Sequence, residues 1–290
     1  MPSATTFRAA LVQLRSGREI GPNMAAAEDL IRAAAAEGAA YIQTPENTPL
    51  MELGTERLFE RIKPEGETTI LGDFSRLAAD LRVWLHIGSL AVRVGERKAA
   101  NRAFVFAPDG SLAARYDKIH MFDVDLPSGE SYRESKNYAP GATAVAVRLP
   151  WGLLGVTTCY DLRFPEHYKA LAQAGADMLA VPAAFTKVTG QAHWHILLRA
   201  RAIETGCFVL AAAQGGMHEN GRATYGHSLI VSPWGEVLAE AGEEPGVISA
   251  EIDIGEVAAA RQRIPALTHV REFELRVMGE AEAPKAAAER

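Results

Sequence analysis

The chain has 290 residues, of which 48% are hydrophobic and 23% are charged, and its 30 basic and 36 acidic side chains give a formal net charge of −6. A net acidic chain argues against nucleic acid or an anionic membrane as the main partner, because both require a basic surface. Two cysteines that build no disulfide framework, an N-terminus without an apolar signal core and the lack of a ~20-residue apolar run together predict a cytoplasmic protein.

Strand and helix patterns alternate along the chain with no linker between them. Strands are predicted at 7–14, 40–43, 84–93, 101–107, 111–116, 143–149, 153–158, 178–181, 208–213, 227–231 and 247–252. Helices are predicted at 22–38, 67–82, 165–174 and 191–205. The polar stretch 117–142 is predicted to be a long loop, of the kind that is functional or disordered.

This alternation predicts one α/β domain over residues 1–279. The last residues, 280–290, are mostly alanine, glutamate and lysine with no apolar face. They are predicted to form a flexible C-terminal tail.

Cys159 is the first candidate nucleophile. It follows the apolar stretch LLGVTT (153–158) and precedes YDLRFPE (160–166), where a helix is expected to begin. Backbone N–H groups at such a strand-to-helix turn can face a reacting carbonyl. A buried cysteine that acts as a small hydrophobe fits this context equally well. Cys207 lies in the apolar stretch GCFVLAAA (206–213) and is predicted to be structural.

Glu46 and Lys118 also follow predicted strands. Glu46 stands in QTPEN (43–47), and Lys118 stands in YDKIHMFD (116–123), just past a predicted hairpin. Taken alone, Glu46 would be a cap or turn residue and Lys118 a solvated charge. Because strand ends gather in one crevice of a stacked α/β fold, both side chains are expected to lie near Cys159.

These three segments, in this order, resemble the glutamate, lysine and cysteine motifs of the nitrilase superfamily, the carbon–nitrogen hydrolases. The resemblance runs from about Phe7 to about Glu272. One departure is Thr44, where many relatives carry leucine before the Pro-Glu pair. The resemblance implies a four-layer α-β-β-α sandwich of two mixed sheets that assembles as a homodimer or a larger homo-oligomer. It implies no metal and no organic cofactor.

The resemblance also implies a mechanism for cleaving amides. Cys159 would attack the carbonyl and form a thioester, while Glu46 takes the thiol proton and passes one to the departing ammonia. Lys118 and the Tyr160 backbone N–H would form the oxyanion hole. Glu134, in YRESK (132–136), matches a second glutamate that orients the lysine and the substrate.

Further segments resemble the Nit branch of the superfamily, namely FDVDLP (122–127), PAAFTKVTGQAHW (182–194) and LRARAIET (198–205). That branch contains the ω-amidases, which act on 2-oxoglutaramate and 2-oxosuccinamate, and the deaminated glutathione amidases. Because AAAQGGMH (211–218) and YGHS (225–228) resemble the latter more, a small carboxylated ω-amide, preferably deaminated glutathione, is the predicted substrate. The residues predicted to bind it are Arg163, Phe185, Thr186, Lys187 and Arg199, of which the three cations are candidates for its carboxylate.

Other functions stay open at this point. An ω-amidase, an N-carbamoyl amino acid amidohydrolase and an aliphatic nitrilase fit the same motifs. An inactive relative that only binds a partner would not need the complete Glu–Lys–Cys set. A Cys–His protease would use His120 or His167 and would leave the glutamate and the lysine idle.

Several polar residues are predicted to be structural. His227 is expected to hold a loop. His193 and His195, two positions apart on a helix, point in different directions, and no carboxylate is spaced to complete a metal site. The pair Gly215-Gly216 is predicted to form a turn. Ion pairs along one helix are expected among Arg199, Arg201 and Glu204.

Overall fold

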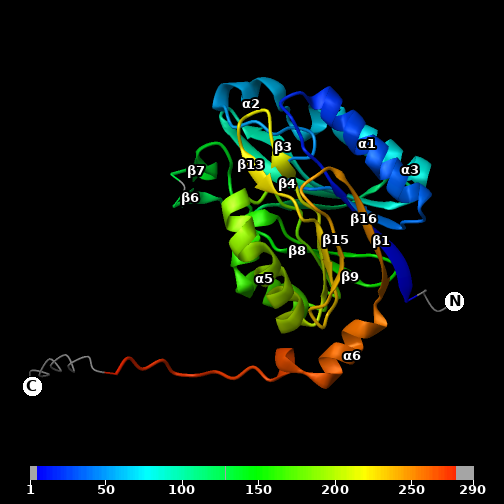
Figure 1. The fold of residues 1–290 in the computed structure, drawn as a ribbon, viewed down its shortest axis with the longest axis vertical. Coiled ribbons are helices and arrows are strands. Elements are labelled where there is room, and N and C mark those ends of the chain that lie inside the picture. The colour runs from blue at the N-terminus through cyan, green and yellow to red at the C-terminus, as the bar shows by residue number, and fades with distance from the viewer. Residues whose placement is uncertain (1–4, 128, 279–290) are drawn as a thin grey trace, which may run out of the picture.

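Two six-stranded sheets face each other in the computed structural model, which describes residues 5–127 and 129–278 (Figure 1). The first sheet has the order β16-β1-β2-β3-β4-β5. Its strands are β1 (Thr6–Gln13), β2 (Tyr41–Gln43), β3 (Trp84–Gly95), β4 (Lys98–Phe106), β5 (Leu112–Asp117) and β16 (Gly246–Asp253). The strands β1, β2 and β3 run parallel, whereas β16, β4 and β5 pair antiparallel with their neighbours, so the sheet is mixed.

The second sheet has the order β15-β14-β11-β10-β9-β8 and is mixed in the same way. Its strands are β8 (Val145–Arg148), β9 (Leu153–Val156), β10 (Met178–Ala180), β11 (Phe208–Ala211), β14 (Leu229–Val231) and β15 (Val237–Glu240). Here β9, β10 and β11 form the parallel centre.

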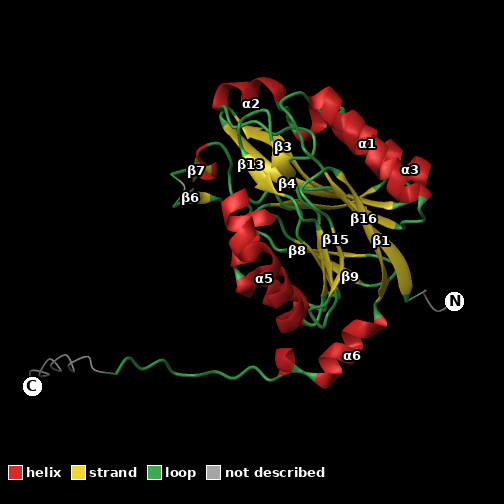
Figure 2. Cartoon of the chain, in the orientation of Figure 1, coloured by secondary structure: helices red, strands yellow, loops and turns green. Residues whose placement is uncertain are grey.

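Helices cover the outer face of each sheet (Figure 2). The helices α1 (Ile20–Ala36) and α3 (Ile70–Leu81) pack on the first sheet, and α4 (Pro165–Gln173) and α5 (Lys187–Thr205) pack on the second. Successive side chains of a strand point to opposite faces. In β1, Ala9 and Leu11 therefore lie in the core between the sheets, while Ala10 and Val12 face the helices. Two buried faces explain the near-continuous apolar strands, and the predicted four-layer α-β-β-α sandwich is confirmed.

Some elements differ from the prediction. The stretch 117–142 is not an unbroken loop, because it contains a small hairpin of β6 (Asp123–Asp125) and β7 (Ser131–Arg133). The predicted turn at Gly215-Gly216 is wrong, since β12 (Gly215–Met217) pairs with β13 (Ala223–Tyr225). Two short helices, α2 (Thr55–Arg61) and α6 (Gly255–Arg263), were not predicted.

Gly88 allows two other segments of the chain to pack closely against β3. A Cβ atom built there would lie 2.1 Å from the Thr44 carbonyl oxygen and 2.3 Å from Pro182 Cβ. Only glycine leaves room for the segment that carries Glu46 to approach the segment that follows β10.

The predicted tail, 280–290, lies outside the described residues, and the domain limit at residue 279 stays a prediction. Among the described residues, no helix combines the length and the apolarity that crossing a membrane requires.

Candidate active site

Cys159 opens a short 3₁₀ helix, η3 (Cys159–Arg163), three residues after Val156, the last residue of β9. Its backbone is left-handed, with φ at 50°, a conformation that is costly for a residue with a side chain. Hydrogen bonds hold the turn. The Cys159 N–H donates to Pro182 O at 2.9 Å, and the Thr158 N–H donates to Asp161 Oδ2 at 2.9 Å. The strained turn presents the buried thiol at the lining of a cavity.

The Glu46 carboxylate, 3% exposed, receives hydrogen bonds from both sheets. Its Oε1 accepts from Asn101 Nδ2 at 2.8 Å and from Lys118 Nζ at 3.0 Å, on the side of the first sheet. Its Oε2 accepts from the Ala184 N–H at 2.9 Å, in the segment that follows β10 of the second sheet. These donors fix the orientation of the carboxylate.

The Lys118 ammonium bridges two carboxylates. It donates to Glu46, and to Glu134 Oε1 at 3.0 Å and Oε2 at 2.7 Å. Glu134 is fixed in turn, because its Oε2 accepts the Phe122 N–H at 2.7 Å. Only 2% of Lys118 is exposed, so its ammonium is almost completely removed from solvent.

The ionisation states follow from these contacts. Burial opposes a charge on Glu46, but Lys118, Arg222 and the hydrogen bond from Cys159 hold the pKa of this carboxyl below its ordinary value. Burial also opposes a charge on Lys118, yet Glu134 and Glu46 keep the pKa of its ammonium well above the ordinary value. Burial, and then Glu46, raise the pKa of the Cys159 thiol. At neutral pH the site therefore pairs a neutral thiol with an ionised base and a cation.

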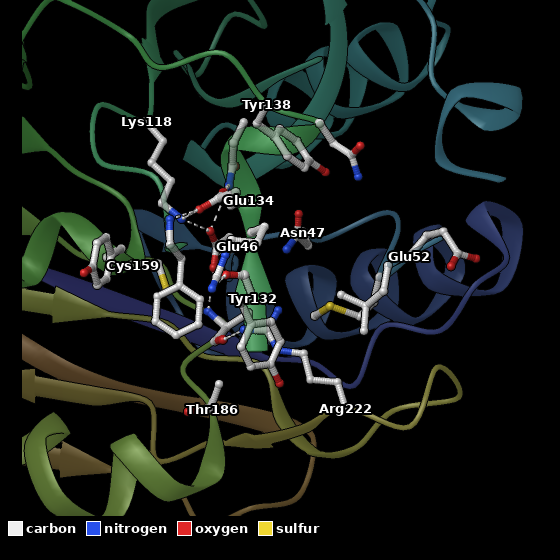
Figure 3. Close-up of a pocket in the computed structure, with 18 of the residues that line it drawn as sticks. Glu46, Asn47, Glu52, Lys118, Tyr132, Glu134, Tyr138, Cys159, Thr186 and Arg222 are labelled. Atoms are coloured by element: carbon white, nitrogen blue, oxygen red, sulfur yellow. Dashed lines mark hydrogen bonds and ion pairs between the residues drawn. The ribbon is translucent and has the colours of Figure 1, made fainter. Parts of the chain in front are cut away.

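A cavity of about 390 Å³ opens over these groups (Figure 3). The four predicted catalytic side chains line it together with Tyr160, so the structure brings all five residues to one place. Other residues of its lining are Asn101, Tyr132, Tyr138, Phe185, Thr186 and Arg222.

Of the predicted substrate-binding residues, only Phe185 and Thr186 line this cavity. Arg163 lies with its guanidinium carbon 5.4 Å from the centre of the Phe185 ring, Lys187 pairs with Glu243 at 2.8 Å, and Arg199 donates to Gly235 O at 2.8 Å. The structure gives these three cations no support as carboxylate-binding residues. Arg199 also makes no ion pair among the described residues, contrary to expectation, whereas Arg201 pairs with Glu204 at 2.8 Å as predicted.

Two polar side chains of the cavity lining were missed in the sequence. Asn101 donates to Glu46 and, at 3.1 Å, to Glu134. A buried amide in the apolar strand KAANRAFVF (98–106) is a signal that could have revealed it. Arg222 follows a turn at Glu219-Asn220 and gave no such signal.

The histidines of the protease alternative lie elsewhere. His120 Nδ1 is 2.7 Å from Asp161 Oδ1, and its ring stacks on Phe164. Within the described part of the chain, neither His120 nor His167 is hydrogen-bonded to Cys159. Cys207 is buried and free, and its Sγ lies 3.2 Å from Ala176 O, in agreement with a structural role.

The structure adds a carboxylate that the sequence spacing did not reveal. Glu240 Oε1 lies 2.8 Å from His195 Nε2 and 2.8 Å from His227 Nδ1, so His227 does hold a loop by hydrogen bonding, as predicted. These three residues, and separately His120, Asp161 and His167, place potential ligand atoms within 4.8 Å of one another. The expectation that no carboxylate would complete a metal site with His195 is therefore wrong, since Glu240 lies within reach. The hydrogen bonds of Glu240 to His195 and His227 are nevertheless sufficient to explain why these three side chains lie together.

The fold and this site define a hydrolase of carbon–nitrogen bonds. The model that describes the carbon-nitrogen hydrolase family matches residues 8–262, and the chain belongs to that family, in the Nit branch of the nitrilase superfamily. It is therefore a hydrolase that acts on carbon–nitrogen bonds other than peptide bonds.

Individual members of the family are similar to this chain over most of its length. The chain is 41% identical to a deaminated glutathione amidase of Synechocystis sp. over 267 residues, which cover 91% of this chain and 97% of the relative. It is 37% identical to human omega-amidase NIT2, with 92% and 96% covered. The crystal structure of the C. elegans NitFhit protein superposes with a TM-score of 0.86 at 33% identity, over 93% of this chain and 66% of that one.

Proposed function

We propose that this chain hydrolyses the ω-amide of deaminated glutathione through a thioester on Cys159. The observation that carries the proposal is the buried arrangement of Glu46, Lys118 and Cys159 at the lining of one cavity. The similarity to a deaminated glutathione amidase along almost its entire length supports the choice of substrate.

The first half of the reaction forms the thioester. Glu46 takes the proton from the Cys159 sulfur as the sulfur attacks the amide carbon, since a buried thiol with a raised pKa needs an adjacent base. The Lys118 ammonium and the Tyr160 N–H stabilise the tetrahedral oxyanion, and such a donor is worth ~3–4 kcal/mol of barrier. Protonated Glu46 then gives its proton to the leaving nitrogen, and the C–N bond breaks.

The second half regenerates the thiol. Glu46 takes a proton from water as the water oxygen attacks the thioester carbon. The second tetrahedral intermediate collapses, the C–S bond breaks, and the sulfur recovers the proton from Glu46. Glu134 takes no proton in this scheme, because its two contacts to Lys118 serve to position the ammonium.

The leaving group depends on the substrate. In deaminated glutathione the ω-amide nitrogen belongs to the dipeptide cysteinylglycine, so the products are that dipeptide and 2-oxoglutarate. The ammonia that the family motifs lead one to expect leaves instead from a primary ω-amide such as 2-oxoglutaramate. That substrate is the second candidate, favoured by the 37% identity to human omega-amidase NIT2.

A comparison of kcat/KM for deaminated glutathione, 2-oxoglutaramate, a carbamoyl amino acid and an aliphatic nitrile tests the proposal. We expect deaminated glutathione to have the highest value, measured as 2-oxoglutarate formed. A higher value for 2-oxoglutaramate would select the second candidate. Cleavage of only the nitrile or the carbamoyl compound would refute both.

We also propose that the chain acts as a homodimer in the cytoplasm. Exposed apolar side chains on α5, namely Val188, Ile196 and Ile203, support an assembly through this helix. Two unpaired cysteines support a reducing compartment. Light scattering of the purified protein tests the dimer, and a monomeric mass at micromolar concentration would contradict it.

A further inference from the structure

We propose that Arg222 binds the carboxylate at the 2-oxo-acid end of the substrate and thereby selects acidic ω-amides over neutral ones. This inference rests on the proposed function and specifies how that cavity recognises its substrate. In Figure 3, Arg222 lies beneath Tyr132 and points into the same cavity as Cys159, with Glu46 between them in this view. An anion held at Arg222 would thus share one cavity with the reacting thiol.

The hydrogen bonding of Arg222 is incomplete. One Nη atom donates to the Ala184 carbonyl oxygen, which anchors the side chain. Its Nε is buried and has no hydrogen-bond partner within the described residues. No carboxylate of these residues lies within ion-pair distance of it. A buried guanidinium N–H without an acceptor is unfavourable in the empty site, and a bound carboxylate would supply the missing acceptor.

The other cations that line the cavity are differently placed. Lys118 already forms ion pairs with Glu46 and Glu134. Arg133 makes two hydrogen bonds of 2.8 Å to Asp125. Lys136 is exposed to solvent, where an ion pair contributes little. Among the described residues, Arg222 is therefore the cation of the lining that is both sheltered and free of an anionic partner.

The Tyr132 ring lies over the guanidinium of Arg222. The Tyr132 ring centre lies 5.2 Å from the Arg222 guanidinium carbon. A guanidinium uses its planar edge to bind a carboxylate, and arginine is suited to this bidentate geometry. The apolar wall supplied by Phe185 and the Tyr132 ring would face the methylene groups between the two ends of the substrate.

A second role of Arg222 makes a different prediction. Arg222 bonds Ala184 O, the Ala184 N–H bonds Glu46, and the positive charge of Arg222 helps to keep Glu46 ionised. If that were its whole contribution, loss of Arg222 would slow the hydrolysis of every amide by the same factor. Recognition of the substrate carboxylate instead changes the ratio between acidic and neutral substrates.

The test compares 2-oxoglutaramate with its methyl ester, in which a neutral ester group replaces the carboxylate. For the wild type we expect a higher kcat/KM with the acid. In Arg222→Met, the ratio of kcat/KM between acid and ester should fall by about 30-fold or more, the loss expected when one partner of a hydrogen-bonded charge pair is removed. Arg222→Lys keeps the positive charge but lacks the planar guanidinium. Its acid-to-ester ratio should lie between those of the wild type and Arg222→Met.

Arg199→Met is the matched control, because it makes the same change outside the cavity. It should leave the acid-to-ester ratio within about twofold of the wild type. An unchanged acid-to-ester ratio in Arg222→Met, with both values of kcat/KM lowered equally, would overturn the inference. The role of Arg222 would then be limited to its effect on the charge of Glu46. A wild-type enzyme that cleaves both compounds equally well would overturn it too.

Binding without turnover separates this inference from the proposed function. Calorimetry would compare the affinity of Cys159→Ala and of Cys159→Ala/Arg222→Met for the same acid and ester. A preference for the acid that disappears with Arg222 supports the inference even if the wild type hydrolyses neither these compounds nor deaminated glutathione, an outcome that would refute the proposed function alone. Equal affinities for acid and ester in Cys159→Ala would reject the carboxylate site whether or not turnover occurs.

Discussion

Lys118 Nζ lies 3.0 Å from Glu46 Oε1, and both side chains are almost completely buried. An ion pair without solvent keeps its charges only while each partner is present. Glu46 can therefore remain an ionised base beside a thiol because Lys118 is there. In the proposed mechanism the same ammonium stabilises the oxyanion that forms when the thiol attacks.

Replacing the nucleophile or the base should stop the reaction without unfolding the protein. Cys159→Ala removes the attacking sulfur, and Glu46→Gln removes the proton acceptor. We expect each to lower kcat by about 10³-fold or more. Product release measures the loss, and circular dichroism checks the fold. Near-wild-type turnover in either variant would refute the thioester mechanism.

Removing the bridging ammonium should cost stability as well as activity. Lys118→Met leaves Glu46 and Glu134 buried without their common cation. We expect the free energy of unfolding to fall by about 3–5 kcal/mol. Glu134→Gln preserves the ion pair between Lys118 and Glu46, so we expect smaller losses of both stability and activity. Urea unfolding and kcat, measured on both variants, test this order, and equal losses in the two variants would contradict it.

The raised pKa of Cys159 predicts its reactivity toward iodoacetamide. A thiol whose pKa lies above its ordinary value forms little thiolate at pH 7, so alkylation should be slow there and accelerate as the pH rises through the alkaline range. Peptide mapping locates the label, and Cys159→Ala provides the control. A rate that is fast and independent of pH between 6 and about 9 would indicate a preformed thiolate instead.

Two buried histidines should make the protein sensitive to mild acid. Burial lowers the pKa of His86 to about 3 and that of His218 to about 4. The unfolded chain takes up protons on these groups below about pH 6.5 while the folded protein does not, so stability is complete above that pH and falls as the pH drops toward the folded values.

Between pH 7.5 and about 5 we expect a loss on the order of 2 kcal/mol for each histidine, measured by urea unfolding. His218→Gln should be less stable at pH 7.5, because His218 contacts Ser16 O and Thr224 Oγ1, but its stability should depend less on pH. Equal pH slopes for the wild type and this variant would argue against the depressed pKa of His218.

The close approach at Gly88 predicts a site that tolerates no methyl group. Gly88→Ala would push against the Thr44 backbone, and we expect a loss of about 1–3 kcal/mol in the free energy of unfolding together with reduced kcat. Gly95→Ala is the control in the same strand, because its new Cβ would lie 3.6 Å from the nearest atom, Lys98 Cβ. Equal losses of stability and kcat in the two variants would contradict a special role of the close contact at Gly88.

The strands and the proximity of the reactive residues were predictable because each signal is local. The apolar runs that became β1 and β9 mark buried strands, and each of Glu46, Lys118 and Cys159 stands just after a strand. Their convergence follows from the topology, whereas their catalytic roles stay predictions.

The part that could not be predicted depends on contacts between distant segments. Arg222 enters the cavity only because β12 and β13 form a hairpin, which the glycine pair did not suggest. Arg163, Lys187 and Arg199 stand in segments that resemble the family, but the structure directs their side chains toward Phe185, Glu243 and Gly235. A motif indicates which residues belong to a region, and packing decides which of them face the substrate.

The position of Glu46 between two sheets has a consequence for how the enzyme loses activity. Its Oε1 is held by side chains from the first sheet and its Oε2 by the Ala184 N–H from the second. A small displacement of one sheet relative to the other would break the hydrogen bonds to one of the two carboxylate oxygens while both sheets remain folded. Under the proposed mechanism the rate of catalysis therefore depends on the alignment of the two sheets. We expect substitutions in the core far from the cavity to lower kcat while the secondary structure remains intact.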